Sequence, residues 1–240
     1  MKIVAVSNLF NEADILPAIL ANLEYQGVDE IFTTDSMSTD GTRALVKGCP
    51  IPNTMIDAPG PYHHQEKMMN LVATMGREAG ADWILPFDGD EFWDSALHPT
   101  IRETLEGCDV PVIAATCYQY FDTTRREPEP KPYPKVCFKP LGGFHLAMGS
   151  HWVHMDWYTG PTATGHLNVR EVQFRGFDHF KWKVHQRNDA FPPEVPGGSG
   201  AHVRKWAAMS DEELEAEWDA MNARATEYDP IPVRLPEWKP

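Results

Sequence analysis

The first 95 residues alternate between segments typical of strands and segments typical of helices. Short apolar runs, about the length of buried strands, are separated by stretches whose apolar positions recur every three or four residues. The expected strands cover 3–7, 30–34, 54–57 and 83–87, and the expected helices run from an N-cap at Asn11 to a stop at Gly27, over a short stretch after Thr42, and from Gln65 to Ala79. Strands that alternate with helices predict a three-layer, mostly parallel, Rossmann-like α/β sheet.

The second half of the chain lacks this alternation. After an expected strand at 110–118, the proline-rich segment 127–134 cannot form a regular element, and residues 135–180 are expected to form β-ribbon and loops. A loop at 192–200 precedes a capping box at 210–213, which opens a helix, and an extended tail starts at Asp229. We therefore expect a single domain over residues 1–240, with halves at 1–125 and 126–240 that differ in structure.

Composition narrows the class of protein. At 240 residues with 42% hydrophobic content, the chain is long enough to bury a full core. A formal charge of -14 argues against a general binder of nucleic-acid backbones. The four cysteines form no Cys-x-x-Cys pair, and the apolar run at the N-terminus is too short to span a membrane. These features predict reduced thiols, a cytoplasmic location and no stable membrane insertion.

Three carboxylates, Asp88, Asp90 and Glu91, follow the apolar strand expected at 83–87. One interpretation is a solvated turn, because Asp-Gly is a common turn dipeptide. The other is a hard divalent cation bound at the carboxyl end of a buried strand, where open α/β sheets bind ligands. Since such cations bridge to phosphate oxygens, the second interpretation predicts a phosphorylated or nucleotide-linked substrate.

A turn-rich segment, 35–42, follows the second expected strand. Its local structure is expected to be a strand-to-helix loop, with Asp40-Gly41 as a turn and Thr42 near the N-cap. Asp35, at the carboxyl edge of the sheet, could accept a hydrogen bond from a base or a ribose. The chain contains neither a G-x-G-x-x-G fingerprint nor a P-loop, which argues against NAD enzymes and P-loop NTPases.

In their order along the chain, these motifs resemble those of family 2-like glycosyltransferases. The resemblance covers residues 3–93 and rests on Val4-Ala5-Val6, 11–16, 27–29, Asp35, 38–42, Gln65, Lys67, Asn70, 82–85 and the D-x-D-E-F motif at 88–92 of a short branch of that family. Later, 135–140 resembles that branch's K-x-x-x-x-P segment, 149–151 its mid-chain histidine, and 176–182 its closing strand. The resemblance implies a GT-A fold, with a nucleotide-sugar-binding half at 1–125 and a smaller β-rich, acceptor-side half with a C-terminal helix at 126–240.

The same resemblance implies donor-binding residues. Asp35 would hold the uracil or ribose end of the donor, and Lys67 would lie near the base or the diphosphate. Asp88 would lie against the ribose, and Glu12 is also assigned to the donor site. For Lys67 the plainer alternative is a solvated helix face.

For the metal, the resemblance implies Mn²⁺ or Mg²⁺ coordinated by Asp90, with Asp88 nearby and His179 as a further metal or diphosphate contact. Such an ion would act as a Lewis acid for the departing nucleoside diphosphate. The alternative for His179 is a core histidine bonded to the backbone.

Histidines and aromatic residues concentrate in the second half. His151 and His154 would lie on opposite faces of a strand, so structural or acceptor-site roles are favoured over a zinc site. Four aromatic residues could stack on a sugar ring, although packing within the core of the second half is the favoured interpretation: Trp152, Trp157, Tyr158 and Trp182.

Together these features predict a metal-dependent glycosyltransferase that moves a sugar from a nucleoside-diphosphate donor, expected to be a UDP-sugar, with inversion. Inversion needs a general base on the acceptor side, for which Asp156 in the aromatic loop is preferred and Glu171 is the alternative. The acceptor stays open among glycan, lipid, protein and modified nucleobase. The competing hypotheses are a non-catalytic carbohydrate- or nucleotide-binding relative, a sugar-nucleotide pyrophosphorylase, and a zinc hydrolase, which the lack of H-E-x-x-H disfavours.

Overall fold

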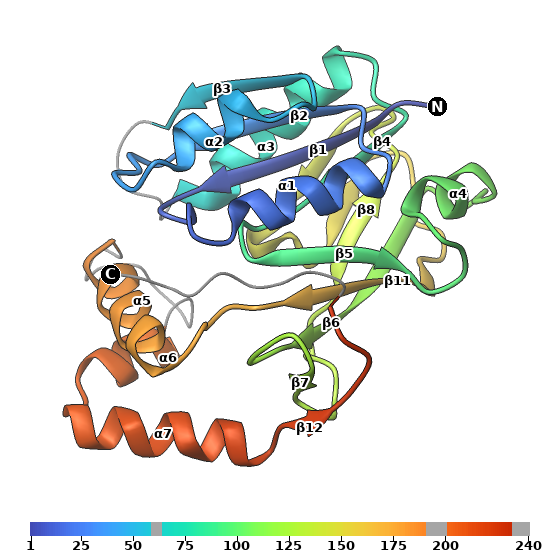
Figure 1. The fold of residues 1–240 in the computed structure, drawn as a ribbon. Helices are drawn as coiled ribbons and strands as arrows, with labels where there is room; N and C mark the ends of the chain where they lie inside the picture. Colours follow the sequence, from blue (N-terminus) through green and yellow to red (C-terminus); the bar gives the residue numbers. More distant parts are fainter. Residues whose placement is uncertain (59–63, 191–200, 232–240) are drawn as a thin grey trace.

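An eight-stranded sheet forms the centre of the protein (Figure 1). The computed structural model describes residues 1–58, 64–190 and 201–231. The sheet order is β3-β2-β1-β4-β8-β6-β11-β5, and β9–β10 and β7–β12 form two small antiparallel ribbons. The strands are β1 (Ile3–Leu9), β2 (Glu30–Asp35), β3 (Asn53–Asp57), β4 (Trp83–Pro86), β5 (Glu91–Ser95), β6 (Val112–Gln119), β7 (Arg125–Arg126), β8 (Lys135–Phe138), β9 (Phe144–Leu146), β10 (Val153–Met155), β11 (Ala163–Glu171) and β12 (Thr226–Glu227).

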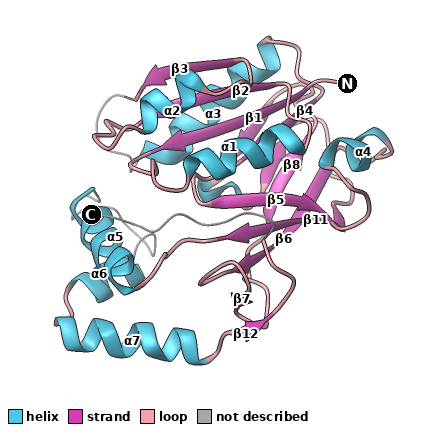
Figure 2. Cartoon of the chain, viewed as in Figure 1, coloured by secondary structure: helices cyan, strands magenta, loops and turns pink. Residues whose placement is uncertain are grey.

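Helices cover both faces of the sheet, and a further group lies at one end (Figure 2). They are α1 (Leu16–Tyr25), α2 (Thr42–Gly48), α3 (Gln65–Glu78), α4 (Ile101–Glu106), α5 (Phe177–Ala190), α6 (Ala201–Ala207) and α7 (Asp211–Ala223), with a 3-10 helix at Met148–Ser150. The group at one end consists of α5, α6 and α7, which share a small apolar cluster of their own.

Strand β1 shows how the two faces are built. Ile3 and Ala5 pack into the same apolar cluster as Ile19 of α1, whereas Val4 packs into the cluster that contains Val72 of α3. Because successive side chains of a strand point to opposite faces, one apolar strand serves both layers. The expected three-layer α/β fold, with a mostly parallel central sheet, is confirmed.

The strand order reverses at β1. From β1 the chain moves to β2 and then to β3 on one side, and β4 returns to pair with β1 on its other side, with all these pairs parallel. Helices on both faces make the parallel crossovers. In open α/β sheets, ligands bind in the crevice that opens at the carboxyl ends of the strands where the order reverses. The crevice between β1 and β4 is therefore where a ligand site is expected.

The second half of the chain extends this sheet with mixed pairing. β8 is antiparallel to both β4 and β6, so its first residue, Lys135, lies toward the carboxyl end of β4. β11 is parallel to β6 and antiparallel to the edge strand β5, which places Glu171 directly opposite Glu91. The antiparallel strands thus bring residues of the second half to the same edge where the parallel strands end.

Two elements differ from the sequence-based expectation. The stretch 176–182 is not a closing strand, because Gly176, at φ 102°, ends the extended chain and α5 begins at the next residue. Phe180 and Val184, four residues apart, pack on Leu214 of α7, which is helical spacing. Asn11 does not cap α1, since its side-chain oxygen accepts a hydrogen bond from the backbone of Thr39 and the helix begins at Leu16.

Two smaller expectations are confirmed. Ser210 and Glu213 form the expected capping box, and all four cysteines carry free thiols. Within residues 1–58, 64–190 and 201–231, no helix is long and apolar enough to cross a membrane. The loop expected at 192–200 and most of the tail lie outside the described residues.

Candidate functional site

Acidic side chains gather at the edge of the sheet where the parallel strands end. Glu12 follows β1, Asp35 is the last residue of β2, and Asp88 and Asp90 follow β4. Parallel strands present their carboxyl ends at one edge, so these residues meet although up to 78 positions separate them. Gly89 permits the close approach, because a Cβ atom there would lie 2.7 Å from Cγ of Glu12.

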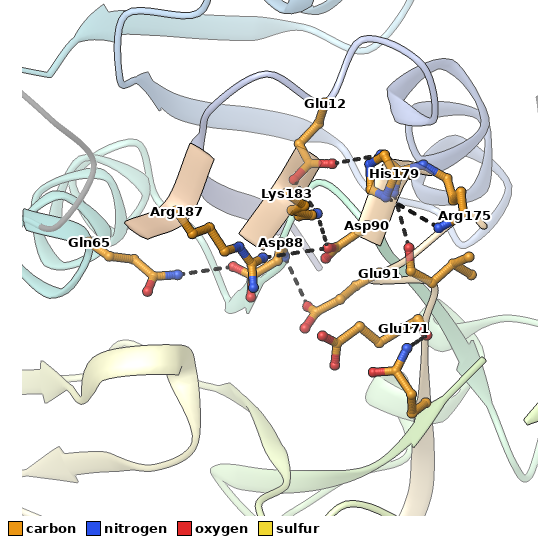
Figure 3. A network of polar contacts seen from close by, with 12 residues as sticks. Glu12, Gln65, Asp88, Asp90, Glu91, Glu171, Arg175, His179, Lys183 and Arg187 are labelled. Atoms are coloured by element: carbon orange, nitrogen blue, oxygen red, sulfur yellow. Dashed lines mark hydrogen bonds and ion pairs between the residues drawn. The ribbon is translucent and has the colours of Figure 1, made fainter. Parts of the chain in front are cut away.

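Lys183 of α5 lies between two of these carboxylates (Figure 3). Its Nζ is 2.8 Å from Oε1 of Glu12 and 2.7 Å from Oδ2 of Asp90, and we call these three residues the Lys183 cluster. Burial opposes ionisation of Asp90, but the charges of Lys183 and Arg187 outweigh it and hold the Asp90 pKa below its usual value. Burial raises the pKa of Glu12. Asp90 is thus an ionised carboxylate with a buried counter-ion.

Lys135 of β8 makes a second buried pairing. Its Nζ is 2.7 Å from Oδ2 of Asp88 and 2.7 Å from Oε1 of Glu91, and we call these three residues the Lys135 cluster. Burial raises the pKa of Glu91 to about 8, although Lys135 opposes the shift. The pKa of Lys135 lies well above its usual value, because burial is outweighed by Asp88 and Glu91. Two carboxylates share one ammonium, and burial favours the protonated form of Glu91.

Glu171 borders the Lys135 cluster from β11. Its Oε2 accepts hydrogen bonds from Lys131 and, at 3.6 Å, from the thiol of Cys117. Only 11% of its side chain is exposed. Glu171 is thus a carboxylate close to the cluster, with a single lysine as its ion-pair partner among the described residues.

Three basic residues on or beside α5 face the acidic edge. Together with His179 they recur every four residues. Arg175 lies just before the helix, and Lys183 and Arg187 lie four and eight residues after His179. The guanidinium of Arg175 binds Asp14 at 2.6 Å and contacts Nε2 of His179 at 2.7 Å, while its backbone N–H donates to Nδ1 at 3.2 Å. Burial and the charges of Lys183 and Arg175 lower the pKa of His179. His179 is a buried, neutral ring with both nitrogens against Arg175.

Asp35 lies at a more open part of the same edge. Its Oδ2 accepts from Arg43 at 2.8 Å and from the backbone of Ser38, whereas its Oδ1 is buried and has no hydrogen-bond partner among the described residues. We call the adjoining space the Asp35 cavity; it has a volume of about 440 Å³ and is lined by Asp35, Met37, Ser38, Arg43 and Asp57. An unpaired buried carboxylate oxygen is costly to the folded protein.

Hydrogen bonds join the Asp35 cavity to the Lys183 cluster. The hydroxyl of Thr42, at the start of α2, accepts from the backbone N–H of Glu12 at 2.9 Å. Asp40 accepts from Ala13, and Ser38 accepts from Asn11. The loops after β1 and β2 therefore form one unit that connects the two parts of the edge.

Two other residues predicted for the site belong to neither cluster, and the role of Lys67 stays a prediction. Lys67 is on the exposed side of α3. The backbone N–H of Asp156 bonds to Gly143, next to the carbonyl of Gly142 that accepts from Arg77 in the last turn of α3.

The length of α3 separates Asp156 from Asp88. The first residue of α3, Gln65, donates to Oδ1 of Asp88 at 3.2 Å. Gln65 and Arg77 lie about 18 Å apart along a helix axis. The structure therefore does not bring Asp156 to the carboxylates of the β1–β4 crevice.

The residues expected to hold Mn²⁺ or Mg²⁺ do not fit such an ion in this arrangement. Oδ2 of Asp90 is paired with Lys183, Oδ2 of Asp88 with Lys135, and both nitrogens of His179 with Arg175. Across the described ranges, no three His, Cys, Asp or Glu side chains form a group that could hold a metal ion. The ion stays a prediction, and to bind the Oδ2 atoms of Asp88 and Asp90 it would have to displace these lysines.

Lys183, Arg175 and Arg187 were not recognised from the sequence. Their signal was present, since Arg175, His179, Lys183 and Arg187 recur at intervals of four, one face of a helix. Interpreting 176–182 as a strand hid that pattern. Lys135 was noted only as part of the K-x-x-x-x-P segment, without a role.

The two histidines of the β9–β10 region take different positions. Nδ1 of His151 contacts the carbonyl of Pro134 at 2.9 Å, whereas His154 is exposed on β10, so the two do not form a zinc pair. Trp152 and Trp157 are 57% and 45% exposed, which corrects the expectation that they pack in the core.

No protein-family model and no curated protein matches this sequence. Among solved structures, the chain is similar to residues 1–349 of TarS from S. aureus in complex with UDP, at 12% identity and a TM-score of 0.49, covering 91% of this chain and 70% of that one. It is also similar to glucosyl-3-phosphoglycerate synthase from Mycobacterium tuberculosis in complex with Mn²⁺, UDP and glucosyl-3-phosphoglycerate, at 16% identity and a TM-score of 0.35, covering 50% and 44%.

A third similar structure is mannosyl-3-phosphoglycerate synthase from Rubrobacter xylanophilus, at 18% identity and a TM-score of 0.36, covering 51% of this chain and 42% of that one. The chain therefore matches under half the length of either synthase. At these identities and TM-scores, a structural likeness carries no conclusion about substrate, cofactor or reaction.

Proposed function

We propose that this chain is a glycosyltransferase that uses a nucleotide-sugar donor, a UDP-sugar in the first instance. One observation carries the proposal: two buried lysine–carboxylate clusters meet at the β1–β4 crevice, beside a cavity into which a base and ribose would fit. Such a preorganised charged site at a strand-order reversal suits a substrate with a phosphate-bearing leaving group. The D-x-D-E-F resemblance at 88–92 supports the same donor class.

The donor would extend along the edge of the sheet. Its nucleoside end would enter the Asp35 cavity, where Asp35 would accept a hydrogen bond from a base N–H or a ribose hydroxyl. Its diphosphate would lie toward Asp88 and Arg187, whose side chains are 30% and 27% exposed. The hydrogen-bonded loops after β1 and β2 link these two positions, which supports one elongated ligand.

The chemistry follows from this placement. The bond between the anomeric carbon and the diphosphate oxygen breaks, and its electron pair stays on the phosphate. The acceptor oxygen forms the new bond from the opposite face and gives its proton to a carboxylate, so the anomeric centre inverts. Glu171 is the base that the geometry favours, because it borders the Lys135 cluster, whereas Asp156 lies near the far end of α3.

A thermal-shift panel tests the donor class. We expect UDP to raise Tm, with GDP and CDP weaker and uridine without its phosphates much weaker, because a ligand that binds only the native state stabilises it. Hydrolysis of a panel of UDP-sugars, measured as UDP release, would then identify the donor sugar. Stabilisation by zinc alone, with no effect of any nucleoside diphosphate, would contradict the proposal.

A further inference from the structure

The Lys183 cluster puts a protein cation where a metal ion was expected. Lys183 is 2% exposed, and its ammonium lies within 2.8 Å of carboxylate oxygens of both Glu12 and Asp90. Asp90 is the second aspartate of the D-x-D motif, the residue to which the sequence resemblance assigns the metal. Its counter-charge is already supplied by a side chain.

The fold holds Lys183 firmly in that position. One side of α5 carries Phe180 and Val184, which are buried against Leu214 of α7. Another side carries His179, Lys183 and Arg187 at intervals of four residues. Since apolar packing sets the rotation of the helix, Lys183 is directed at Asp90 by the same contacts that dock α5.

A divalent ion bound to Oδ2 of Asp90 would compete with Lys183 for that oxygen. A metal bound to Asp90 would lie within a few ångströms of the ammonium, and like charges that close repel strongly when buried. The Lys135 cluster engages Asp88 in the same manner, with Nζ of Lys135 2.7 Å from Oδ2. In both aspartates of the motif, a lysine ammonium therefore occupies the oxygen that a metal ion would use.

Arg187 extends this positive charge toward the accessible side. Its guanidinium is 3.9 Å from Oδ2 of Asp90, and 27% of its side chain is exposed. In Figure 3 it projects from α5 toward Asp88. A planar guanidinium can donate two hydrogen bonds to phosphate oxygens, which suits it to a diphosphate at this edge.

We propose that Lys183 and Arg187 take the place of the divalent cation, so that the chain binds its nucleoside-diphosphate donor without a metal. This inference rests on the proposed function. Lys183 fixes and neutralises Asp90, and Arg187 contacts the diphosphate. When the anomeric carbon leaves, the electron pair stays on the phosphate oxygen, and Arg187 stabilises the charge that develops there.

The decisive measurement uses the wild-type chain. UDP affinity is determined by titration calorimetry in excess EDTA and again with saturating Mn²⁺ or Mg²⁺. We expect the two Kd values to agree within about twofold, since a bound metal normally adds far more to diphosphate affinity. UDP binding that appears only with Mn²⁺ or Mg²⁺ would overturn the inference and leave the proposed function standing. Absence of binding by UDP and GDP under both conditions would remove both.

Two substitutions sharpen the result. Lys183→Ala removes the ammonium from Glu12 and Asp90, so UDP affinity in EDTA should fall by about tenfold or more and Mn²⁺ should restore part of it. The matched control is Lys181→Ala on the same helix. Lys181 is partly exposed and pairs with Asp211, so this variant should bind UDP as the wild type does. If Lys183→Ala does not fold, the wild-type comparison decides the question alone.

Arg187→Lys tests whether Arg187 contacts the diphosphate directly or only contributes positive charge. It keeps a positive charge but loses the planar pair of donors, so UDP should bind more weakly than in the wild type while UMP, which lacks the second phosphate, is affected less. An equal loss for UDP and UMP would contradict direct contact of Arg187 with the diphosphate.

Discussion

The two ends of the candidate site hold their charges in different ways. In the Lys183 cluster, the side chains are at most 10% exposed and every carboxylate has a lysine partner. In the Asp35 cavity, Arg43 bridges the buried Asp35 and the exposed Asp57; the side chains of Arg43 and Asp57 are 37% and 75% exposed. Removing one partner of a buried pair leaves an uncompensated charge, whereas an exposed pair can exchange for a ligand at little cost.

The two ends of the site therefore suit different roles in the proposed function. The closed end is preorganised and suits the reacting centre, where charge develops during the reaction. The open end suits recognition of the nucleoside, where contacts form and break with each turnover. The following changes would break or sharpen that difference.

The largest expected effect comes from removing the buried ammonium of the Lys135 cluster, which neighbours the closed end. Lys135→Met leaves Asp88 and Glu91 without their counter-ion, and we expect the free energy of unfolding to fall by about 3–5 kcal/mol, as measured by urea denaturation. The matched control, Lys205→Met, removes a lysine that is 63% exposed and pairs with Glu217, for an expected loss below about 1 kcal/mol. Equal losses would show that burial of the pair adds no stability.

The next prediction tests which residue is the general base. Glu171→Gln keeps the shape of the side chain but cannot accept a proton, so donor turnover should fall by about 100-fold or more. Asp156→Asn should change turnover much less, because Asp156 lies near the other end of α3. Turnover can be followed as UDP release from a UDP-sugar with water as acceptor. The opposite result would restore the assignment made from the sequence.

The pH dependence of the free energy of unfolding tests the Lys135 cluster. Burial raises the pKa of Glu91 to about 8, above its usual 4.5, so the native state holds one proton more than the unfolded chain between these values. Stability is then complete below the usual pKa and is lost as pH rises through about 8. We expect the free energy of unfolding to fall by about 1.4 kcal/mol per pH unit between about pH 5 and 8, and to level off above that range. In Glu91→Gln that slope should be smaller; an unchanged slope would assign it to another group.

The smallest expected effect is at the open end. Asp35→Asn weakens an acceptor at the cavity, and we expect UDP affinity to drop about tenfold with little change in stability. Asp57→Asn, which alters a 75% exposed side chain of the same ion pair, should change UDP affinity by less than about twofold. Titration calorimetry measures both. Equal effects would mean that the ligand does not distinguish the buried aspartate from the exposed one.

Much of the first half was predictable from local pattern. Apolar runs at 3–7 and 83–87 identified β1 and β4, and helical periodicity identified α3, because each pattern depends on neighbouring residues alone. The carboxylates after β4 were recognised for the same reason. Asp156 shows the limit: its aromatic loop is a local feature, but its distance from Asp88 depends on how the β9–β10 ribbon docks along α3.

The sequence by itself determined a strand–helix alternation that yields a parallel sheet, and it placed acidic residues at the ends of those strands. Only the tertiary structure decided what neutralises them. Lys135 and Lys183 are 47 and 93 positions from their partners Asp88 and Asp90, and they arrive through an antiparallel strand and a helix docked by apolar contacts. Charge pairing over such separations depends on tertiary packing, and no local sequence pattern identifies the partners. As a result, the motif expected to bind a metal forms two buried lysine–carboxylate clusters.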